Sequence, residues 1–420
     1  MVRFPPVAEQ LALLSRGVVD LHVRAELEER LTKSLETGVP LRVKAGFDPT
    51  RPDLHIGHAV LMQKMRQFQV LGHQVIFLVG GFTAMIGDPT GQNEARPRLT
   101  REEVDAAAQT YLDQAFLILD KSVTEVVNNH DWLGALTPSQ FVELMAKVTV
   151  SRMLERNDFA ERFAAHRPIY QHELLYPLAQ AYDSVAIKAD IELGGTDQLF
   201  NLLMGRDLME KYGMRGQMVM TTPLLEGIDA KIVERDGKRV VVGKKMSKSA
   251  DNYVGIREKP IDQYRKIMQV DDEVIWRYFE LLSAKSNEEI AELRKKYVGG
   301  DPREAKGIFA KEIITRFHDA AAAEHAEAEF RKAYTADAIP DDVPTIAVPT
   351  DQATIPIYVA LKIANLVTSS SDGMRLVEQG GVELDRARVS DPKTKLERGK
   401  KYLVRVGSKN RKFAYLVVGS

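Results

Sequence analysis

Two histidines stand one helical turn apart in the stretch DLHIGHAV, residues 53–60. His55 and His58 follow a proline-containing loop, GFDPTRPD, at the point where a helical pattern begins. The first turn of a helix presents free backbone N–H groups and the positive end of the helix dipole, and both attract phosphate. We therefore interpret the two imidazoles as hydrogen-bond donors to a phosphate chain. Gly57, between them, allows a ligand to approach the helix closely.

A metal site and a purely structural role are the two alternatives for this histidine pair. The spacing His-x-x-His can place two ligands on one helix face. Zinc requires a third protein ligand, however, and this stretch has no Glu placed as in the zinc protease motif. We therefore predict no metal site. A pair of hydrogen-bonded structural histidines remains open beside the phosphate site.

A second cationic element lies far downstream, in the stretch GKKMSKS. It contains Lys244, Lys245 and Lys248 together with Ser247, directly after Gly243. A polar loop of this composition suits wrapping a pyrophosphate, although many basic loops are no more than solvated turns. Each element alone is a weak signal. Together, in this order and after a strand–helix unit, they indicate a nucleotide site.

The elements that must position these residues alternate between strand and helix patterns. Strands are predicted at residues 42–46, 75–81, 124–127 and 185–193, and helices at 56–71, 102–119 and 197–210. This alternation predicts an α/β fold with a doubly wound, Rossmann-like parallel sheet, in which ligands bind at the carboxyl ends of the strands. The pair Gly194-Gly195 falls at such an end.

The second half of the chain follows a different pattern. A hairpin is predicted at residues 231–242 around Asp236-Gly237. We predict a catalytic domain over residues 1–250 with a helical insertion, an all-α domain over 251–335, a proline-rich linker over 336–352 and a small α+β domain over 353–420. The last segment holds 13 Lys and Arg against 6 Asp and Glu, so it carries a net charge of +7 and suits an anionic partner.

Composition excludes several classes of protein. The 420 residues contain no cysteine, which rules out disulfides, thiolate metal sites and a thiol nucleophile. The first residues do not resemble a signal peptide, and the longest apolar run, near residues 75–79, is too short to span a bilayer. We therefore expect a cytoplasmic protein without a membrane partner.

The motifs together resemble those of the class I aminoacyl-tRNA synthetases, and in detail those of the bacterial tyrosyl-tRNA synthetases. The matching stretches are GFDPT with LHIGH, IGDPTG (86–91), NNHDW (128–132), YPLAQAYD (176–183), GGTDQ (194–198) and KMSKS (245–249), in the family's order. The tail, with TSSSDGMRLVEQGGVELD (368–385), resembles the small S-four-type RNA-binding domain of these enzymes.

The resemblance implies a two-step reaction. L-tyrosine and ATP, with Mg²⁺ on the phosphates, would give tyrosyl-adenylate and pyrophosphate, and tyrosine would then pass to the 3′ end of tRNA(Tyr). The resemblance further implies that the all-α domain lies on the anticodon side. It also implies a homodimer, with its interface in the helical insertion near residues 140–167.

The resemblance also assigns roles to individual residues. The catalytic residues would be Thr50, His55, His58, Lys245 and Lys248. ATP would be bound by Gly57, Arg96, Gly194, Gly195, Asp197 and Ser247. Tyrosine would be bound by Lys44, Thr83, Asp88, Asn129, Tyr176, Gln180, Asp183 and Gln198. Among these, Tyr176, Gln180 and Asp183 share one helix face, and Asp183 would accept the phenolic hydroxyl. Asp197 would bind ribose, and a helix N-cap is its alternative role.

Two positions depart from the family's pattern. Lys44 stands where many relatives have tyrosine, and we expect it either to pair with a buried carboxylate or to lie on the surface. Gln92 stands where lysine is frequent, which leaves Arg96 as the candidate for that phosphate contact.

Three other functions compete with this interpretation. Tryptophanyl-tRNA synthetases share the fold, but Gln180, GFDPT and the basic tail favour tyrosine. Small nucleotidylyltransferases share the His-x-Gly-His element but lack the lysine loop. A non-catalytic RNA-binding relative is disfavoured because His55, Lys248 and the other motif residues are intact.

Overall fold

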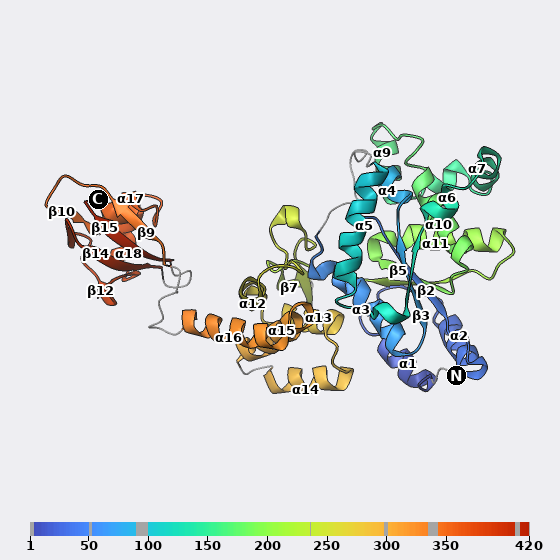
Figure 1. The fold of residues 1–420 in the computed structure, drawn as a ribbon, viewed down its shortest axis with the longest axis horizontal. Coiled ribbons are helices and arrows are strands. Elements are labelled where there is room, and N and C mark those ends of the chain that lie inside the picture. Colours follow the sequence, from blue (N-terminus) through green and yellow to red (C-terminus); the bar gives the residue numbers. More distant parts are fainter. Residues whose placement is uncertain are drawn as a thin grey trace. The chain divides into compact units, whose positions relative to one another are not determined.

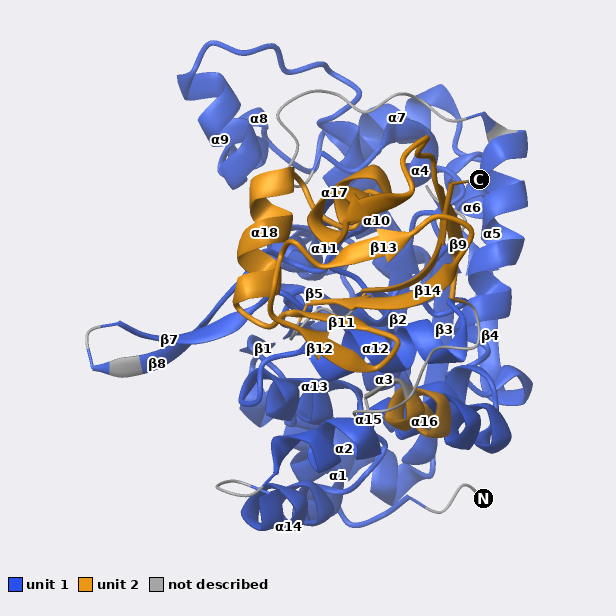
Figure 2. Ribbon diagram, turned by 90° about the vertical axis from the view of Figure 1, so that its left-hand side faces the viewer, with its two compact units in different colours: residues 1–326 blue, residues 327–420 orange. Residues whose placement is uncertain are grey.

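The computed structural model describes residues 4–49, 53–89, 100–235, 237–297, 301–334, 343–407 and 412–419. Residues 1–326 form one compact unit and residues 327–420 form another (Figure 2). No helix among the described residues is long and apolar enough to cross a membrane.

A six-stranded sheet organises the first unit (Figure 1). Its strands are β1 (Leu21–His22), β2 (Arg42–Phe47), β3 (Gln74–Val79), β4 (Thr124–Asn128), β5 (Ile191–Gly195) and β6 (Met218–Thr222), in the order β1-β6-β5-β2-β3-β4. Strands β2 to β6 pair in parallel, and only β1 is antiparallel to its neighbour. The chain thus winds outward in both directions from β2 and β5, which confirms the predicted doubly wound fold.

Helices connect and cover these strands. They are α1 (Val7–Leu14), α2 (Arg24–Thr37), α3 (Ile56–Val70), α4 (Thr83–Ile86), α5 (Arg101–Ala115), α6 (His130–Leu133), α7 (Pro138–Met145), α8 (Val150–Leu154), α9 (Asn157–Ala164), α10 (Leu175–Ile187) and α11 (Leu199–Lys211). Because right-handed crossovers run in opposite directions from β2 and from β5, α3 and α11 cover opposite faces of the sheet. The strand β3 is buried along nearly its whole length because α3 packs on it and its Ile76 and Leu78 pack against Ile187 and Ala189 at the end of α10.

One predicted strand is partly wrong. Residues 185–187 do not begin a strand but complete α10, which ends at Lys188 in the left-handed conformation with φ 55°. The strand β5 starts only at Ile191. The error arises because a short apolar run such as VAI fits a buried helix end as well as a strand. The strands β1 and β6 were not predicted from the sequence, because β1 has only two residues and β6 is rich in Met and Thr.

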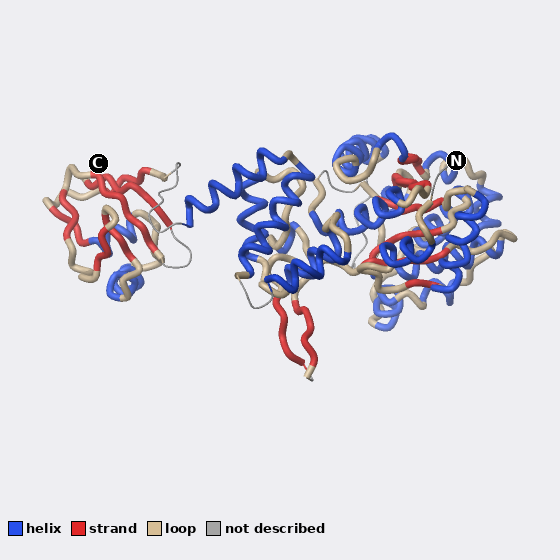
Figure 3. Tube along the Cα trace, turned by 90° about the horizontal axis from the view of Figure 1, so that it is seen from below, coloured by secondary structure: helices blue, strands red, loops and turns tan. Residues whose placement is uncertain are grey.

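The hairpin forms where it was predicted, and the residues after it are helical as expected. Strands β7 (Lys231–Arg235) and β8 (Lys238–Val242) pair antiparallel and extend as a two-stranded arm (Figure 3). The helices are α12 (Pro260–Gln269), α13 (Val274–Leu282), α14 (Asn287–Tyr297), α15 (Pro302–Phe317) and α16 (Ala320–Tyr334). The helices α12 to α15 belong to the same compact unit as the sheet, and the boundary between the units falls within α16.

The second unit is a small α+β fold with its own core. Its elements are β9 (Thr345–Val348), β10 (Thr354–Pro356), α17 (Ile357–Ile363), α18 (Ser370–Glu378), β11 (Val382–Leu384), β12 (Ala387–Val389), β13 (Lys395–Glu397), β14 (Lys401–Val406) and β15 (Lys412–Val418). Leu361, Val404 and Leu416 are among its fully buried residues. The predicted linker over residues 336–352 is wrong in part, because β9 lies within it and pairs in parallel with β15. Prolines on either side of TIAV gave this strand the composition of a linker.

Candidate active site

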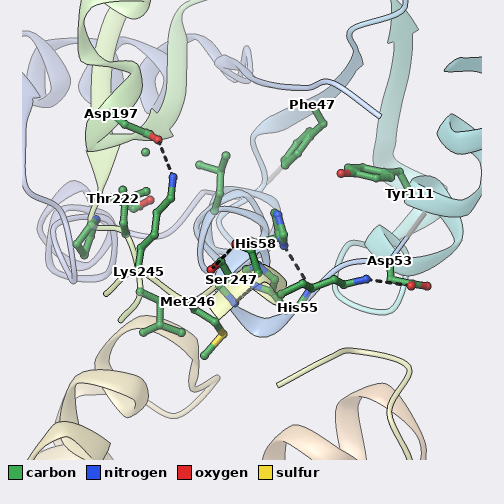
Figure 4. Close-up of a pocket in the computed structure, with 18 of the residues that line it drawn as sticks. Phe47, Asp53, His55, His58, Tyr111, Asp197, Thr222, Lys245, Met246 and Ser247 are labelled. Carbon is green, nitrogen blue, oxygen red and sulfur yellow. Dashed lines mark hydrogen bonds and ion pairs between the residues drawn. The ribbon is translucent and has the colours of Figure 1, made fainter. Parts of the chain in front are cut away.

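A cavity of about 730 Å³ opens at the carboxyl ends of β2 and β5, where the strand order reverses. The histidine motif at the start of α3 lies on one side of the cavity and the lysine loop lies on another (Figure 4). The lining includes Phe47, Asp53, His55, Gly57, His58, Tyr111, Gly195, Asp197, Thr222, Lys245, Met246, Ser247 and Lys248. Two motifs far apart in the sequence therefore line one cavity.

The two histidines cap α3 with their own side chains. The Nδ1 atom of His55 accepts a hydrogen bond from the backbone N–H of Gly57 at 3.1 Å, and Nδ1 of His58 accepts from the backbone N–H of His55 at 3.2 Å. Because both Nδ1 atoms act as acceptors, each neutral ring carries its proton on Nε2. The histidines are therefore structural, as one alternative held, and each still has an Nε2–H donor to offer a ligand.

Burial keeps both rings neutral. Removal from water, together with the neighbouring His58, Lys248 and Lys245, lowers the pKa of His55 to about 3. Burial likewise lowers the pKa of His58 to about 4. At neutral pH the pair thus supplies hydrogen-bond donors without adding charge. Within the described residues, no group of three or more His, Asp or Glu side chains is arranged to hold a metal ion.

Gly57 makes room for the side chain of His55. A Cβ atom added at this position would lie 2.8 Å from Nδ1 of His55 and 3.6 Å from Cβ of Met246. The first of these distances is too short for unbonded atoms, so any larger residue would push the His55 ring out of its capping position. The need for glycine here comes from the His55 ring as well as from any ligand.

The lysine loop is fixed at its base. Met246 is buried, and its backbone N–H donates to the carbonyl of Leu225 at 2.8 Å. The side-chain oxygen of Asn252 accepts from the backbone N–H of Ser247 at 2.8 Å, while its nitrogen donates to Asp229 at 3.0 Å. These contacts hold the loop backbone beside the cavity and leave the two lysine side chains to reach across it.

Lys245 and Lys248 each face a carboxylate of the cavity lining, and Figure 4 shows the side chain of Lys245 directed towards Asp197. Nζ of Lys248 donates to Asp53 at 2.9 Å, and Nζ of Lys245 lies 3.9 Å from Oδ2 of Asp197. Burial raises the pKa of Asp197, and the positive charge of Lys245 opposes that rise. The helix N-cap role considered for Asp197 is wrong, because this residue lies inside a short 3₁₀ turn, Thr196–Gln198, and the N-cap of α11 is Gln198.

A buried polar cluster lies on the other side of the β2 strand end. Asp48 accepts hydrogen bonds from the hydroxyls of Thr83 at 2.7 Å and Tyr176 at 2.8 Å. Asn129 donates to Thr83 at 3.1 Å and to Asp183 at 3.2 Å. Thr83, Asn129, Tyr176 and Asp183 were predicted from the sequence to share a site, and the structure links them in one network through Asp48.

Asp183 and Lys44 are both fully enclosed. Asp183 also accepts from the indole N–H of Trp132 at 2.8 Å, and burial raises its pKa to about 7. Nζ of Lys44 lies 3.0 Å from Glu192, and both side chains are 1% exposed. Gln180 donates to the same carboxylate at 3.2 Å. Of the two expectations for Lys44, pairing with a buried carboxylate is confirmed and a surface position is wrong.

Asp88 and Gln198 form a third contact near the cavity. The Gln198 amide donates to Asp88 at 2.9 Å, and Arg156 donates to the other carboxylate oxygen at 3.2 Å. Arg156 belongs to the helical insertion, directly before α9, and its guanidinium is buried. Nothing in the sequence pattern distinguishes this arginine from the other charged residues of the insertion.

Some predicted residues cannot be placed, and some site residues had no prediction. Thr50, Gln92 and Arg96 lie outside the described residues. Asp48, Trp132, Arg156 and Glu192 were missed. Asp48 and Trp132 stand inside the motifs GFDPT and NNHDW, so those motifs carried a usable signal. Glu192 is a lone charge in an apolar strand, which is the pattern of a buried partner for another charge.

The comparisons with known proteins fit this geometry. The family model of class I tRNA synthetases for tryptophan and tyrosine matches residues 36–335. A curated tyrosine–tRNA ligase of Burkholderia thailandensis is 49% identical over 409 residues, covering 97% of this chain and 95% of that protein. One of Geobacter sulfurreducens is 48% identical, covering 97% and 98%. The chain belongs to the tyrosine–tRNA ligase family.

Solved structures of more distant ligases share the fold. The tyrosyl-tRNA synthetase of Archaeoglobus fulgidus, solved with L-tyrosine, aligns with a TM-score of 0.60 at 22% identity and covers 76% of this chain and 99% of its own. A truncated mitochondrial enzyme of Aspergillus nidulans aligns with a TM-score of 0.62 at 20% identity, covering 78% and 94%. The class I architecture of the ligase is therefore retained at low sequence identity.

The lowered pKa of His58 predicts a pH-dependent contribution to stability. In the unfolded ligase this histidine binds a proton near pH 6.5, whereas the folded protein resists protonation until about pH 4. Its contribution is thus complete above pH 6.5 and is lost as the pH falls towards 4, by up to about 1.4 kcal/mol per pH unit. A His58→Gln variant should therefore lose less unfolding free energy than the wild type over this range in urea titrations.

The control for this measurement is His325→Gln, because His325 is exposed on α16. Its stability should follow the wild type at every pH. Parallel curves for the wild type and His58→Gln between pH 7 and pH 4 would contradict the assignment of a buried, neutral imidazole.

Proposed function

We propose that the cavity activates L-tyrosine with ATP and that the resulting tyrosyl-adenylate then charges the 3′ end of tRNA(Tyr). One observation carries this proposal. Two neutral imidazoles with free Nε2–H donors line the same cavity as two lysines, at the carboxyl ends of β2 and β5. Such an array of fixed donors and mobile cations suits a polyphosphate whose charge grows during the reaction.

In the first step, a carboxylate oxygen of tyrosine forms a bond to the α-phosphorus of ATP. The bond from that phosphorus to the oxygen bridging towards the β-phosphate breaks, and pyrophosphate leaves with the electron pair. His55, His58, Lys245 and Lys248 stabilise the charge that develops on the phosphates, and Asp197 accepts hydrogen bonds from the ribose hydroxyls. In the second step, a terminal ribose hydroxyl of tRNA attacks the carbonyl carbon and AMP leaves.

The buried cluster beside the cavity binds the amino acid. Asp183 accepts the phenolic hydroxyl at the closed end of the site. Asp88, Tyr176 and Gln180 bind the α-ammonium, with Asp48 as an added acceptor on the Tyr176 side. Thr83, Asn129 and Gln198 hold these carboxylates in place, as their hydrogen bonds support.

ATP enters with Mg²⁺ on its phosphates. The phosphate side of the cavity offers mainly imidazole and lysine groups, which suit phosphate oxygens and not a cation. The phosphates themselves would therefore hold the magnesium, which neutralises part of their charge. Thr50 and Arg96 complete the phosphate contacts, and Gly57, Gly194, Gly195 and Ser247 shape the nucleotide side.

The remaining parts of the chain serve the RNA substrate. Residues 251–335 lie on the anticodon side, and the basic domain that follows contacts tRNA through its phosphates. The enzyme works in the cytoplasm as a homodimer whose interface lies near residues 140–167. Exposed apolar side chains on this insertion, among them Val142, Met145, Val150 and Phe163, support that choice.

ATP–pyrophosphate exchange with each of the twenty amino acids tests the proposed function. Exchange should depend on tyrosine. With phenylalanine, Asp183 would be left buried without its third donor, and the loss should be on the order of 10²-fold or more. Equal exchange with tryptophan would indicate the tryptophan enzymes of the same family, and no exchange with any amino acid would indicate a non-catalytic relative.

Lys248 should act on the transition state of activation. Replacing it with alanine should lower kcat for pyrophosphate exchange by on the order of 10²–10³, as for the loss of one preorganised donor. The KM for tyrosine should barely change, because the loop meets the opposite end of ATP. Lys295→Ala, an exposed lysine on α14, is the control and should behave as the wild type. A normal kcat for Lys248→Ala would indicate that the loop is only a solvated turn and does not act on the transition state.

The basic domain should be needed for tRNA and not for activation. The deletion should begin after Tyr334, because cutting at residue 353 would leave β9 without its partner strand β15. Pyrophosphate exchange should stay near the wild-type rate, while tRNA charging should fall and the salt dependence of tRNA binding should flatten. Unchanged charging of tRNA by the shortened enzyme would refute this role.

A further inference from the structure

A buried ion pair joins the two central strands of the sheet beside the proposed tyrosine site. Lys44 on β2 and Glu192 on β5 are directly opposed in the parallel pairing of these strands. Nζ and Oε1 are 3.0 Å apart, and each side chain is 1% exposed. Removing two charges from water is unfavourable unless every polar atom finds a partner. A buried ion pair therefore adds little to stability on its own, and a second role should be considered.

Glu192 is held from four directions. Its Oε1 atom accepts from Lys44 and from Gln180, the latter at 3.2 Å. Its Oε2 atom accepts from Ser184 at 3.2 Å and, at close range, from Gln217. These donors come from β2, from α10 and from the segment before β6, so the carboxylate cannot rotate freely. Its position fixes the ammonium of Lys44 in turn.

Asp183 is joined to this pair through α10, because the next residue, Ser184, donates to Glu192. Asp183 accepts from Trp132 at 2.8 Å and from Asn129 at 3.2 Å, and an ionised carboxylate has lone pairs for at least one further donor. The charged groups that act on it are Lys44 from β2 and Glu192 from β5. The pKa of Asp183 lies at about 7, because burial and, to a lesser degree, Glu192 raise it more than Lys44 and the hydrogen bonds from Trp132 and Asn129 lower it.

We propose that Lys44 is a positioning residue for the choice of tyrosine. Glu192 holds the ammonium close to Asp183, where its fixed positive charge keeps that carboxylate ionised and able to accept the phenolic hydroxyl. Lys44 itself makes no contact with the substrate in this arrangement, because its partner is Glu192. This inference rests on the proposed function, since it deepens the role given to Asp183.

The two members of the pair should affect Asp183 in opposite directions. Lys44→Met removes the positive charge, so the pKa of Asp183 should rise and the carboxyl should be protonated at a higher pH. Glu192→Gln removes the negative charge, so the pKa of Asp183 should fall. A role limited to packing would not produce this opposition, because either change would disturb the same region of the core.

Tyrosine binding measured by equilibrium dialysis without ATP, from pH 5.5 to pH 9, tests the proposal. In the wild type the affinity should weaken below about pH 7. In Lys44→Met the inflection should move up by about one pH unit or more, which weakens binding at neutral pH by about tenfold per unit and lets it recover at pH 9. In Glu192→Gln the inflection should move down.

Two further variants keep the result decisive. Lys44→Met leaves Glu192 buried without its partner charge and could fail to fold, so the double variant Lys44→Met/Glu192→Gln removes both charges together. Its inflection should lie above that of Glu192→Gln, a difference due to Lys44 alone. Lys64→Met is the matched control, because Lys64 is a buried lysine that donates to the carbonyls of Leu14 and Arg16, and it should leave the inflection unmoved.

The outcomes separate this inference from the proposed function. If the wild type exchanges pyrophosphate with tyrosine and the inflection is the same in all variants, or moves in the same direction in both single variants, the role of Lys44 is overturned while the function stands. If the wild type does not select tyrosine in the exchange assay, the proposed function fails and this inference fails with it.

Discussion

The parallel pairing of β2 with β5 is the contact on which the site depends. These strands lie at the point where the order of the sheet reverses, so the connections that follow them leave towards opposite faces. The loop after β2 leads to the histidine-capped start of α3, and the turn after β5 carries Asp197. One pairing thus brings together side chains that are far apart in the chain. The same pairing aligns Lys44 with Glu192 beside the proposed amino-acid end of the site.

The capping of α3 shows how one group can serve the fold and the chemistry together. A helix N-cap is usually Ser, Thr, Asp or Asn, whose oxygen accepts from the free backbone N–H groups. Here two imidazoles do this through Nδ1, which fixes the tautomer and leaves the Nε2–H for a ligand. A structural role and the proposed ligand-binding role are therefore compatible, since the capping bonds orient the Nε2–H donors that we propose for the ligand.

Much of this arrangement could be predicted from the sequence, and the reasons for the failures are physical. The motifs around His55, Asp183 and Lys248 consist of particular residue types at short spacings. Residues at such spacings lie close together in one helix turn or at one strand end, so their relative positions can be predicted. Partners across the sheet follow from strand register, which local spacing does not contain, and for this reason Glu192 could not be assigned to Lys44. Arg156 reaches Asp88 from an insertion whose fold has no distinctive pattern.

The predicted boundaries of helices, strands and the linker were wrong where the composition of a segment suits two kinds of structure. Val185 to Ile187 are apolar in a helix end as they would be in a strand, and only the left-handed Lys188 marks the end of α10. The strand β9 lies between prolines and gains its stability from pairing with β15, which follows about seventy residues later in the chain. Local sequence cannot reveal a strand whose partner is that distant.

The pairs formed by the loop lysines change how dissolved salt should act on nucleotide binding. Lysines that meet a polyanion normally make its affinity fall steeply as ionic strength rises, because ions screen the attraction. Here Lys245 and Lys248 already face Asp197 and Asp53, and all four side chains are more than a quarter exposed. Under the proposed function ATP displaces these internal pairs, so salt would loosen the pairs at the same time as it weakens the new contacts. The two effects oppose each other, so this nucleotide site should tolerate changes in ionic strength better than its lysine content suggests.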